Sequence, residues 1–108
     1  MTEDGDDGAT RIFHTRRNFG DTYAEASAWT VPESDRYPDG VKYSLQYGSL
    51  EPAETIIRYD NFPDHKGAPR HHKHTESGEV VGVDYDGIRK LYQQFRQEVR
   101  DDHGEEWD

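Results

Sequence analysis

Residues Val41 to Tyr47, which read VKYSLQY, place apolar and polar side chains in strict alternation. A period of two is the repeat of a β-strand that has one buried face and one face in water. Such a strand needs partner strands and a covering layer, since it cannot bury its apolar face alone. The apolar positions of the strand are Val41, Tyr43, Leu45 and Tyr47.

Four other segments are predicted to be extended: Thr10–Asn18, Thr22–Val31, Glu54–Asn61 and the short Glu79–Val83. The first two are separated by the turn signal Phe19-Gly20-Asp21, so we expect them to form a hairpin. Within the second, three alanines alternate with polar residues and would share one face. The fourth strand is expected to pair with the third, and Phe62–Gly78 is expected to be a long loop.

A helix is predicted from about Gly87 to Arg100, with Asp84 or Asp86 as its N-cap. Its apolar residues fall at helical spacing and would pack on the sheet. They are Ile88, Leu91, Tyr92, Phe95 and Val99. The sequence therefore predicts an α+β fold, with an antiparallel β-sheet of four or five strands and one C-terminal α-helix packed on it.

The 108 residues fit one domain, which we place at residues 10–100. Residues 1–9 are expected to be a disordered acidic tail, and residues 101–108 a second acidic tail in which Trp107 folds back. Only 31% of the residues are hydrophobic, which is low for a folded chain. Seven Tyr, four Phe and two Trp can nevertheless carry a small core, because each buries a large area.

Charge and composition restrict the compartment. The net charge is -10, and Arg outnumbers Lys by nine to four, a composition typical of proteins from a high-salt cytoplasm. There are no cysteines, so disulfides and thiolate chemistry are excluded. The acidic start does not resemble a secretory signal, and no apolar run approaches the ~20 residues that span a membrane. We expect a cytoplasmic protein without membrane contact.

The candidate site is the segment RYDNFPDHKGAPRHHKH, from Arg58 to His74. It holds four of the six histidines and several cations, so it forms an electropositive region in an acidic chain. Cleavage of RNA needs a base for the 2′-OH and an acid for the leaving oxygen, and histidine suits both roles. Arg or Lys would stabilise the developing charge, Asp60 would orient an imidazole, and Tyr59 or Tyr47 would stack on a base.

Two other interpretations stay open on the residues alone. The segment can be a surface loop that balances acidic neighbours, or a non-catalytic patch that docks nucleic acid or an acidic partner. It can also be a divalent-metal site, because His72 and His74 point the same way in an extended chain and could bind a metal with His65 and Asp60. No second spaced ligand pair accompanies these residues.

Three pieces of the sequence resemble the TumE-like toxins, over about Arg11 to Arg100: Tyr43–Tyr47, Ile57–Asn61 and His72–His74. The long acidic ends are departures that fit a halophile-type version. The resemblance implies the toxin of a type II toxin–antitoxin pair, with a helix-turn-helix antitoxin as partner, ribonuclease activity and RNA as substrate. We also keep a homodimer open. Given the resemblance, the leading interpretation is metal-independent acid–base cleavage without a cofactor.

The site residues under this interpretation fall into two groups. The catalytic group is Arg58, Asp60, His65, His72 and His74. His72 and His74 are the acid and base candidates, and Arg58 is the charge stabiliser. The residues expected to bind the substrate are Tyr59, Asn61, Arg70, His71 and Lys73, with Lys73 on a phosphate.

Overall fold

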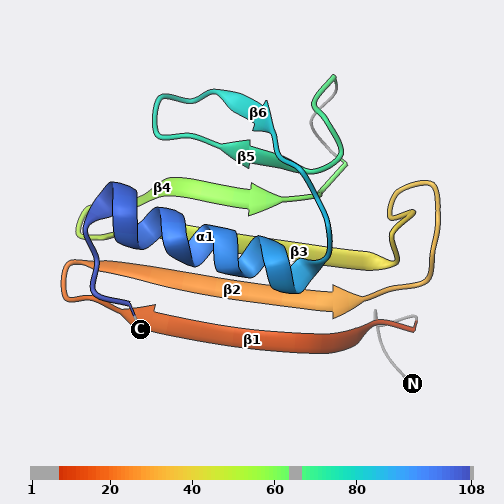
Figure 1. The fold of residues 1–108 in the computed structure, drawn as a ribbon, viewed down its shortest axis with the longest axis horizontal. Helices are drawn as coiled ribbons and strands as arrows, with labels where there is room; N and C mark the ends of the chain where they lie inside the picture. The colour runs from red at the N-terminus through yellow and green to blue at the C-terminus, as the bar shows by residue number, and fades with distance from the viewer. Residues whose placement is uncertain (1–7, 64–66, 108) are drawn as a thin grey trace.

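The computed structural model describes residues 8–63 and 67–107, which form one antiparallel sheet and one helix (Figure 1). Residues 1–7, most of the expected N-terminal tail, lie outside the described part, as does His65. The elements are β1 (Thr10–Asn18), β2 (Thr22–Thr30), β3 (Val41–Leu50), β4 (Ala53–Asp60), β5 (His72–His74), β6 (Val80–Gly82) and α1 (Ile88–His103). The predicted α+β class and the antiparallel sheet with a C-terminal helix are confirmed.

The six strands follow one another in the sheet in the order of the sequence, so each hairpin is local. The β1–β2 turn contains Gly20 at φ 102°, a backbone conformation that glycine adopts without strain. The segment 62–78 was predicted to be a loop throughout. The structure places strand β5 inside it, so that prediction is wrong at His72–His74. Three residues are too few to show a period, and β5 is held by its pairing with β4 and β6.

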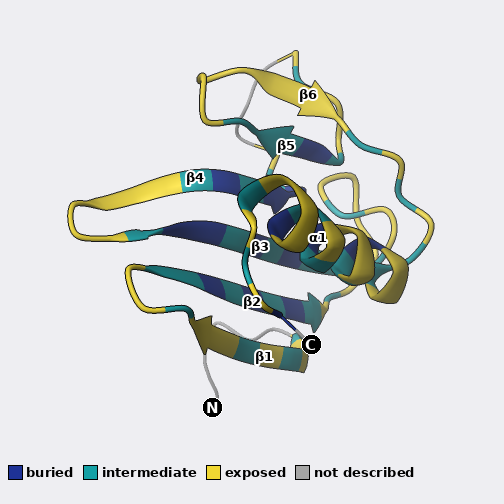
Figure 2. Ribbon diagram, turned by 60° about the vertical axis from the view of Figure 1, so that its left-hand side comes forward, coloured by how far each residue is buried: buried dark blue, intermediate teal, exposed yellow. Residues whose placement is uncertain are grey.

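Helix α1 lies across one face of the sheet, over the middle strands (Figure 1). Its buried residues Leu91, Phe95 and Val99 meet the apolar side of β2, β3 and β4. The alternating residues of β2 and β3 are buried on this side as predicted, and Figure 2 shows burial concentrated in the central strands and the inner side of α1. Trp107 folds back as expected and is 8% exposed, with its ring edge-on to Phe95.

Both ends of α1 differ from the prediction. Gly87 occupies the N-cap, and no side chain caps the helix there. The Asp86 carboxylate instead accepts a hydrogen bond from Lys90 Nζ at 2.8 Å, one turn along the helix surface. At the other end the helix runs to His103, and Gly104 ends it in the left-handed conformation at φ 71°. Part of the segment expected to be an acidic tail is thus helical.

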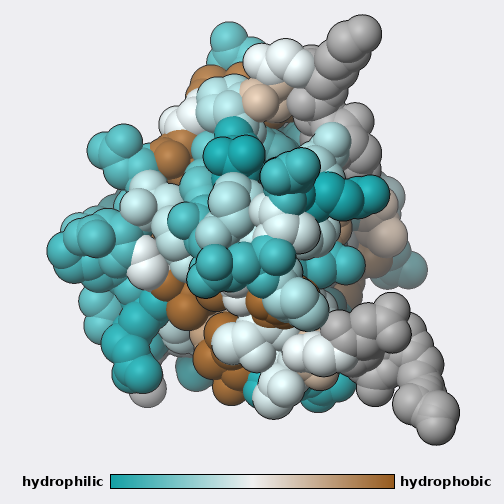
Figure 3. Space-filling model, turned by 90° about the vertical axis from the view of Figure 1, so that its right-hand side faces the viewer, coloured by the Kyte–Doolittle hydropathy of each residue, from teal (hydrophilic) through white to brown (hydrophobic). Residues whose placement is uncertain are grey.

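The sheet face opposite α1 is called the open face, since the residues described place no helix on it (Figures 1 and 2). Strand register brings one crosswise row of polar residues together there, one from each of the first five strands. The row is Arg16, Glu25, Gln46, Arg58 and His74. No helix among the described residues is long and apolar enough to cross a membrane. Seen from the end where α1 begins, the molecule is mostly hydrophilic, with small separate apolar patches (Figure 3).

Candidate functional site

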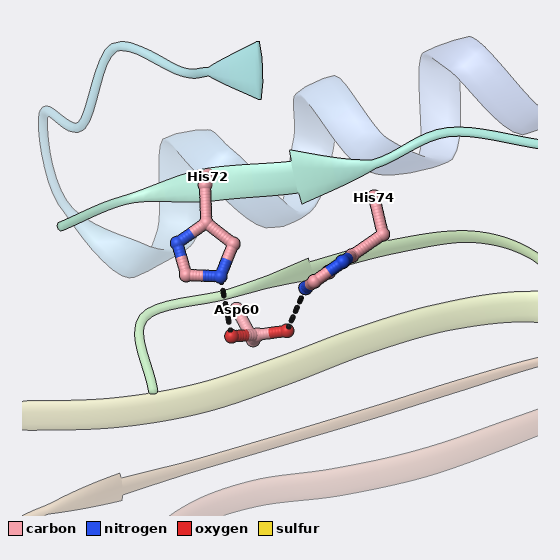
Figure 4. A group of neighbouring side chains, drawn as sticks. All are labelled: Asp60, His72 and His74. Carbon is pink, nitrogen blue, oxygen red and sulfur yellow. Dashed lines mark ion pairs between the residues drawn. The ribbon is translucent and has the colours of Figure 1, made fainter. Parts of the chain in front are cut away.

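Strands β4 and β5 bring four of the predicted catalytic residues together. Antiparallel register pairs Arg58 with His74 and Asp60 with His72. Because alternate residues of a strand share a face, all four side chains lie on the open face. Figure 4 shows both imidazoles reaching from β5 toward the Asp60 carboxylate on β4, with α1 behind the sheet. We call these four side chains the Asp60 cluster.

The carboxylate of Asp60 is fully buried and is contacted at both oxygens. Oδ1 accepts a hydrogen bond from the Phe62 backbone N–H at 3.0 Å and lies 3.0 Å from Nε2 of His72. Oδ2 accepts from Arg58 Nε at 2.8 Å and lies 3.2 Å from Nε2 of His74. A buried carboxylate needs this density of donors and positive charge to offset the water that it has lost.

His72 is 1% exposed and sits between two acceptor oxygens. Its Nδ1 lies 2.9 Å from the carbonyl oxygen of Pro69, and its Nε2 faces Asp60. His72 therefore ties the loop before β5 to the carboxylate, and its position suits support of Asp60 rather than contact with a substrate.

His74 and Arg58 are the members of the cluster that reach the surface, with side chains 19% and 32% exposed. Nε2 of His74 lies 3.2 Å from Nη2 of Arg58 and 3.2 Å from Oδ2 of Asp60. With a proton on Nε2, the ring donates to Asp60; without it, the ring accepts from Arg58. The site thus offers a partner for either protonation state of one exposed imidazole, which is what a proton-transferring group needs.

Tyr59 and Lys73 lie on the other side of the sheet, under α1. Both contact Glu98 of the helix: the Tyr59 hydroxyl donates to it, and Lys73 Nζ is 3.1 Å from its carboxylate. Burial, and then the hydrogen bond to Glu98, raises the pKa of Tyr59, so its hydroxyl stays protonated. The structure does not bring these two residues to the Asp60 cluster.

His71 also faces away from the cluster. Its ring is stacked 4.0 Å from the ring of Tyr85, and its Nδ1 is 2.9 Å from the Tyr43 hydroxyl. Its Nε2 lies 2.7 Å from Asp39 in the β2–β3 loop. Burial raises the pKa of Tyr43, so its hydroxyl keeps its proton. These contacts of His71 connect the loop before β3 to the segment that leads into β5.

The structure does not bring Asn61 or Arg70 into the cluster. Asn61 is buried, and its amide bonds to the backbone of β3 at Val41 O and Tyr43 N, at 2.7 and 3.1 Å. Arg70 is exposed and lines a hollow of about 320 Å³ with Arg36. His65 lies outside the described residues.

The cluster also contains a set of atoms that could hold a metal ion. One ligand atom each from Asp60, His72 and His74 lies within 4.8 Å of the others. The Nδ1 contact of His72 with a backbone carbonyl is the kind of support that metal-binding histidines have. Arg58 opposes this reading, because its guanidinium already neutralises the same carboxylate and would repel a second cation.

Sequence reasoning missed Gln46 and the backbone groups of Phe62 and Pro69. Gln46 belongs to the polar half of the alternating strand and faces Arg58 across the sheet. Its place beside the cluster follows once the pairing of β3 with β4 has a register, which local sequence does not supply. The Phe62 and Pro69 contacts use backbone atoms, so no residue type signals them.

Together, the fold and the Asp60 cluster define a small α+β domain with a single antiparallel sheet and a buried Asp–His pair on its open face. A family model described as "Toxin TumE" matches residues 3–103. The chain belongs to the TumE toxin family, as the sequence resemblance predicted. Membership of a toxin family implies an antitoxin as partner. No curated protein matches the chain, and no solved structure matches it.

Proposed function

We propose that this chain is the toxin of a type II toxin–antitoxin pair and that it cleaves RNA at the Asp60 cluster without a metal. The observation that carries the proposal is the position of His74 Nε2, 3.2 Å from both a cation and a carboxylate at the surface. A partly exposed imidazole with both kinds of partner suits proton transfer near neutral pH. A helix-turn-helix antitoxin in the same cytoplasm would be its partner.

The reaction would be attack of a ribose 2′ oxygen on the adjacent phosphorus. The 2′ O–P bond forms, the P–O5′ bond breaks, and the products are a 2′,3′-cyclic phosphate and a 5′ hydroxyl. His74 takes the 2′-OH proton, and water gives a proton to the leaving 5′ oxygen. The hydroxide that remains takes the proton back from His74, so the balance closes. Arg58 stabilises the added negative charge on the phosphorane.

Asp60 and His72 act as positioning residues in this proposal. Asp60 holds the Arg58 guanidinium through Nε and leaves Nη2 directed at His74. His72, 1% exposed, holds the other oxygen of the same carboxylate. The four side chains would therefore act as one unit, in which two members contact the phosphate and two fix their orientation.

The test is cleavage of a mixed single-stranded RNA by the purified chain, in EDTA and without it. We expect His74→Ala to lower the rate by roughly 10²- to 10⁴-fold. Arg58→Lys keeps the charge but loses the forked geometry, and should cost roughly 10²- to 10³-fold. The matched control is His14→Ala, an exposed histidine of the same sheet face that pairs with Glu25. Equal rates for His74→Ala and His14→Ala would overturn the catalytic assignment.

A non-catalytic docking role is the second candidate, favoured by the surplus of cations on the open face. In that case His74→Lys would keep RNA binding, because docking needs only positive charge. In the catalytic proposal the same variant binds RNA but does not cleave it. Binding and cleavage measured on this one variant therefore separate the two functions.

A further inference from the structure

A hollow of about 370 Å³ opens beside the Asp60 cluster, toward the β3–β4 hairpin. Its lining includes Arg16 of β1, Tyr23 of β2 and Gln46 of β3. These residues come from three neighbouring strands and lie on the open face in the pairing register. The hollow is a feature of the sheet surface, not of the histidine-rich segment.

Gln46 is the neighbour that the hollow and the cluster share. Gln46 lines the hollow and is also the register partner of Arg58. Neighbouring strands are about 5 Å apart, so the two side chains are one strand spacing from each other. A ligand whose phosphate lies at Arg58 and His74 would reach the hollow with its adjacent group.

The lining suits a flat ring with polar edges. The Arg16 guanidinium lies 4.4 Å from the centroid of the Tyr23 ring, which makes a cation–π pair. Gln46 Nε2 donates to the Tyr23 hydroxyl, and the amide also has an oxygen that can accept a hydrogen bond. Guanidinium planes and aromatic rings are the groups on which single-stranded bases stack, and side-chain amides read base edges.

The charge of the open face supports an anionic polymer as the ligand. Among the strand positions described, the register places four permanent cations on this face against two carboxylates, one of them the buried Asp60. Glu54 of the β3–β4 hairpin also lines the hollow and adds one carboxylate there. The whole chain has the opposite balance, with a net charge of -10. The cations are Arg11, Arg16, Lys42 and Arg58, and the carboxylates are Glu25 and Asp60.

We propose that the hollow formed by Arg16, Tyr23 and Gln46 holds one nucleobase of single-stranded RNA, next to the phosphate bound at Arg58 and His74. The proposal rests on the proposed function and adds the part of the substrate that the cluster cannot recognise. Tyr23 and Arg16 give stacking, which accepts any base, and Gln46 gives an edge contact, which favours some bases over others.

The test is binding of a labelled single-stranded oligonucleotide with 2′-O-methyl riboses, which cannot be cleaved by 2′ attack. Fluorescence anisotropy gives its affinity for the wild type and for Tyr23→Leu, which removes the aromatic face and keeps an apolar side chain. We expect a loss of roughly 5- to 150-fold, the effect of one stacked base. The matched control is Trp29→Leu, an aromatic of the same face and strand that does not line the hollow.

Arg16→Ala is the second variant, because this exposed side chain can be removed without disturbing the core. Both variants are first shown to melt at the wild-type temperature. Affinity unchanged in both, or lost equally in Trp29→Leu, would overturn the proposal. An arm with nucleoside monophosphates identifies the ligand: binding as tight as that of the oligonucleotide would overturn an RNA ligand in favour of a free nucleotide.

The two proposals fail separately. Tyr23-dependent binding without any cleavage of natural RNA would support the hollow and overturn the catalytic function. Cleavage that depends on His74 but not on Tyr23 or Arg16 would support the catalytic function and overturn the hollow.

Discussion

Asp60 and His72 form an ion pair of 3.0 Å in which the exposed fractions of the two residues are 0% and 1%. The same chain has an exposed counterpart, His14 with Glu25 at 2.8 Å, with side chains 41% and 39% exposed. Each pair joins a histidine to a carboxylate on the same sheet face, one across β4 and β5 and the other across β1 and β2. Their burial differs, and burial decides how much each contributes to stability.

We expect Asp60→Asn to lower the free energy of unfolding by about 3–5 kcal/mol, because it leaves the charges around a buried site uncompensated. Glu25→Gln removes the exposed counterpart and should cost about 0–1 kcal/mol. Urea unfolding followed by circular dichroism measures both. Similar losses in the two variants would contradict the burial of the Asp60 pair.

Stability should fall in alkaline solution because of three tyrosines of β3 and β4. Burial, followed by its hydrogen bond to Glu105, raises the pKa of Tyr47 to about 12, and burial also raises the pKa of Tyr43 and of Tyr59. In the unfolded chain a tyrosine has a pKa of about 10, below the pKa of these three tyrosines in the folded protein. Between the two pKa values the unfolded state therefore binds fewer protons than the folded state. The stabilisation is complete below about pH 10 and is lost as pH rises toward 12.

Urea unfolding between pH 8 and pH 11.5 or so tests this expectation, since the free energy of unfolding should decline steadily above about pH 10. Tyr47→Phe removes one of the ionising groups and should make the decline shallower. A profile that stays level in the wild type, or has the same slope in the variant, would show that these hydroxyls ionise equally in both states.

The acidic surface predicts a dependence on salt. With a net charge of -10, self-repulsion opposes the compact state in dilute buffer, and dense salt screens it. Thermal melts in low and in molar KCl should therefore give a midpoint that rises with salt over the molar range. A midpoint that is constant or falls would count against a halophile-type chain.

Chelation separates acid–base from metal chemistry at the Asp60 cluster. Because Arg58 neutralises the Asp60 carboxylate, we expect EDTA to change neither the cleavage rate nor the melting temperature. The measurement compares untreated protein with protein dialysed against EDTA, and then with added Zn²⁺ or Mn²⁺. Activity that is lost on dialysis and restored by one ion would replace the acid–base mechanism with a metal centre of Asp60, His72 and His74.

The sequence predicted the second and third strands because both show alternation over enough residues, as in Val41–Tyr47. It also predicted that His72 and His74 point the same way. The same rule places Lys73 on the other face, although the sequence interpretation assigned it to the same phosphate. Neighbours in a short histidine-rich stretch were treated as one group, whereas a strand divides them between two faces.

Burial at the cluster was beyond local sequence. The backbone N–H of Phe62 contacts Asp60 and the backbone carbonyl of Pro69 contacts His72, and both side chains are buried. The hollow near Tyr23 depends on the register of three strands, and register is set by the whole sheet. Pairing over long distances in the chain therefore decided which predicted residues could meet a substrate.

Helix α1 follows all six strands in the chain, yet it is the layer that covers the apolar side of the sheet. During synthesis, all six strands therefore leave the ribosome before helix α1 does. The aromatic row of β3 is then exposed to water, and it is buried when residues 88–103 have emerged. A chain that ends before Ile88 would leave the apolar face of the sheet uncovered. We therefore expect truncated translation products to aggregate rather than to be active fragments.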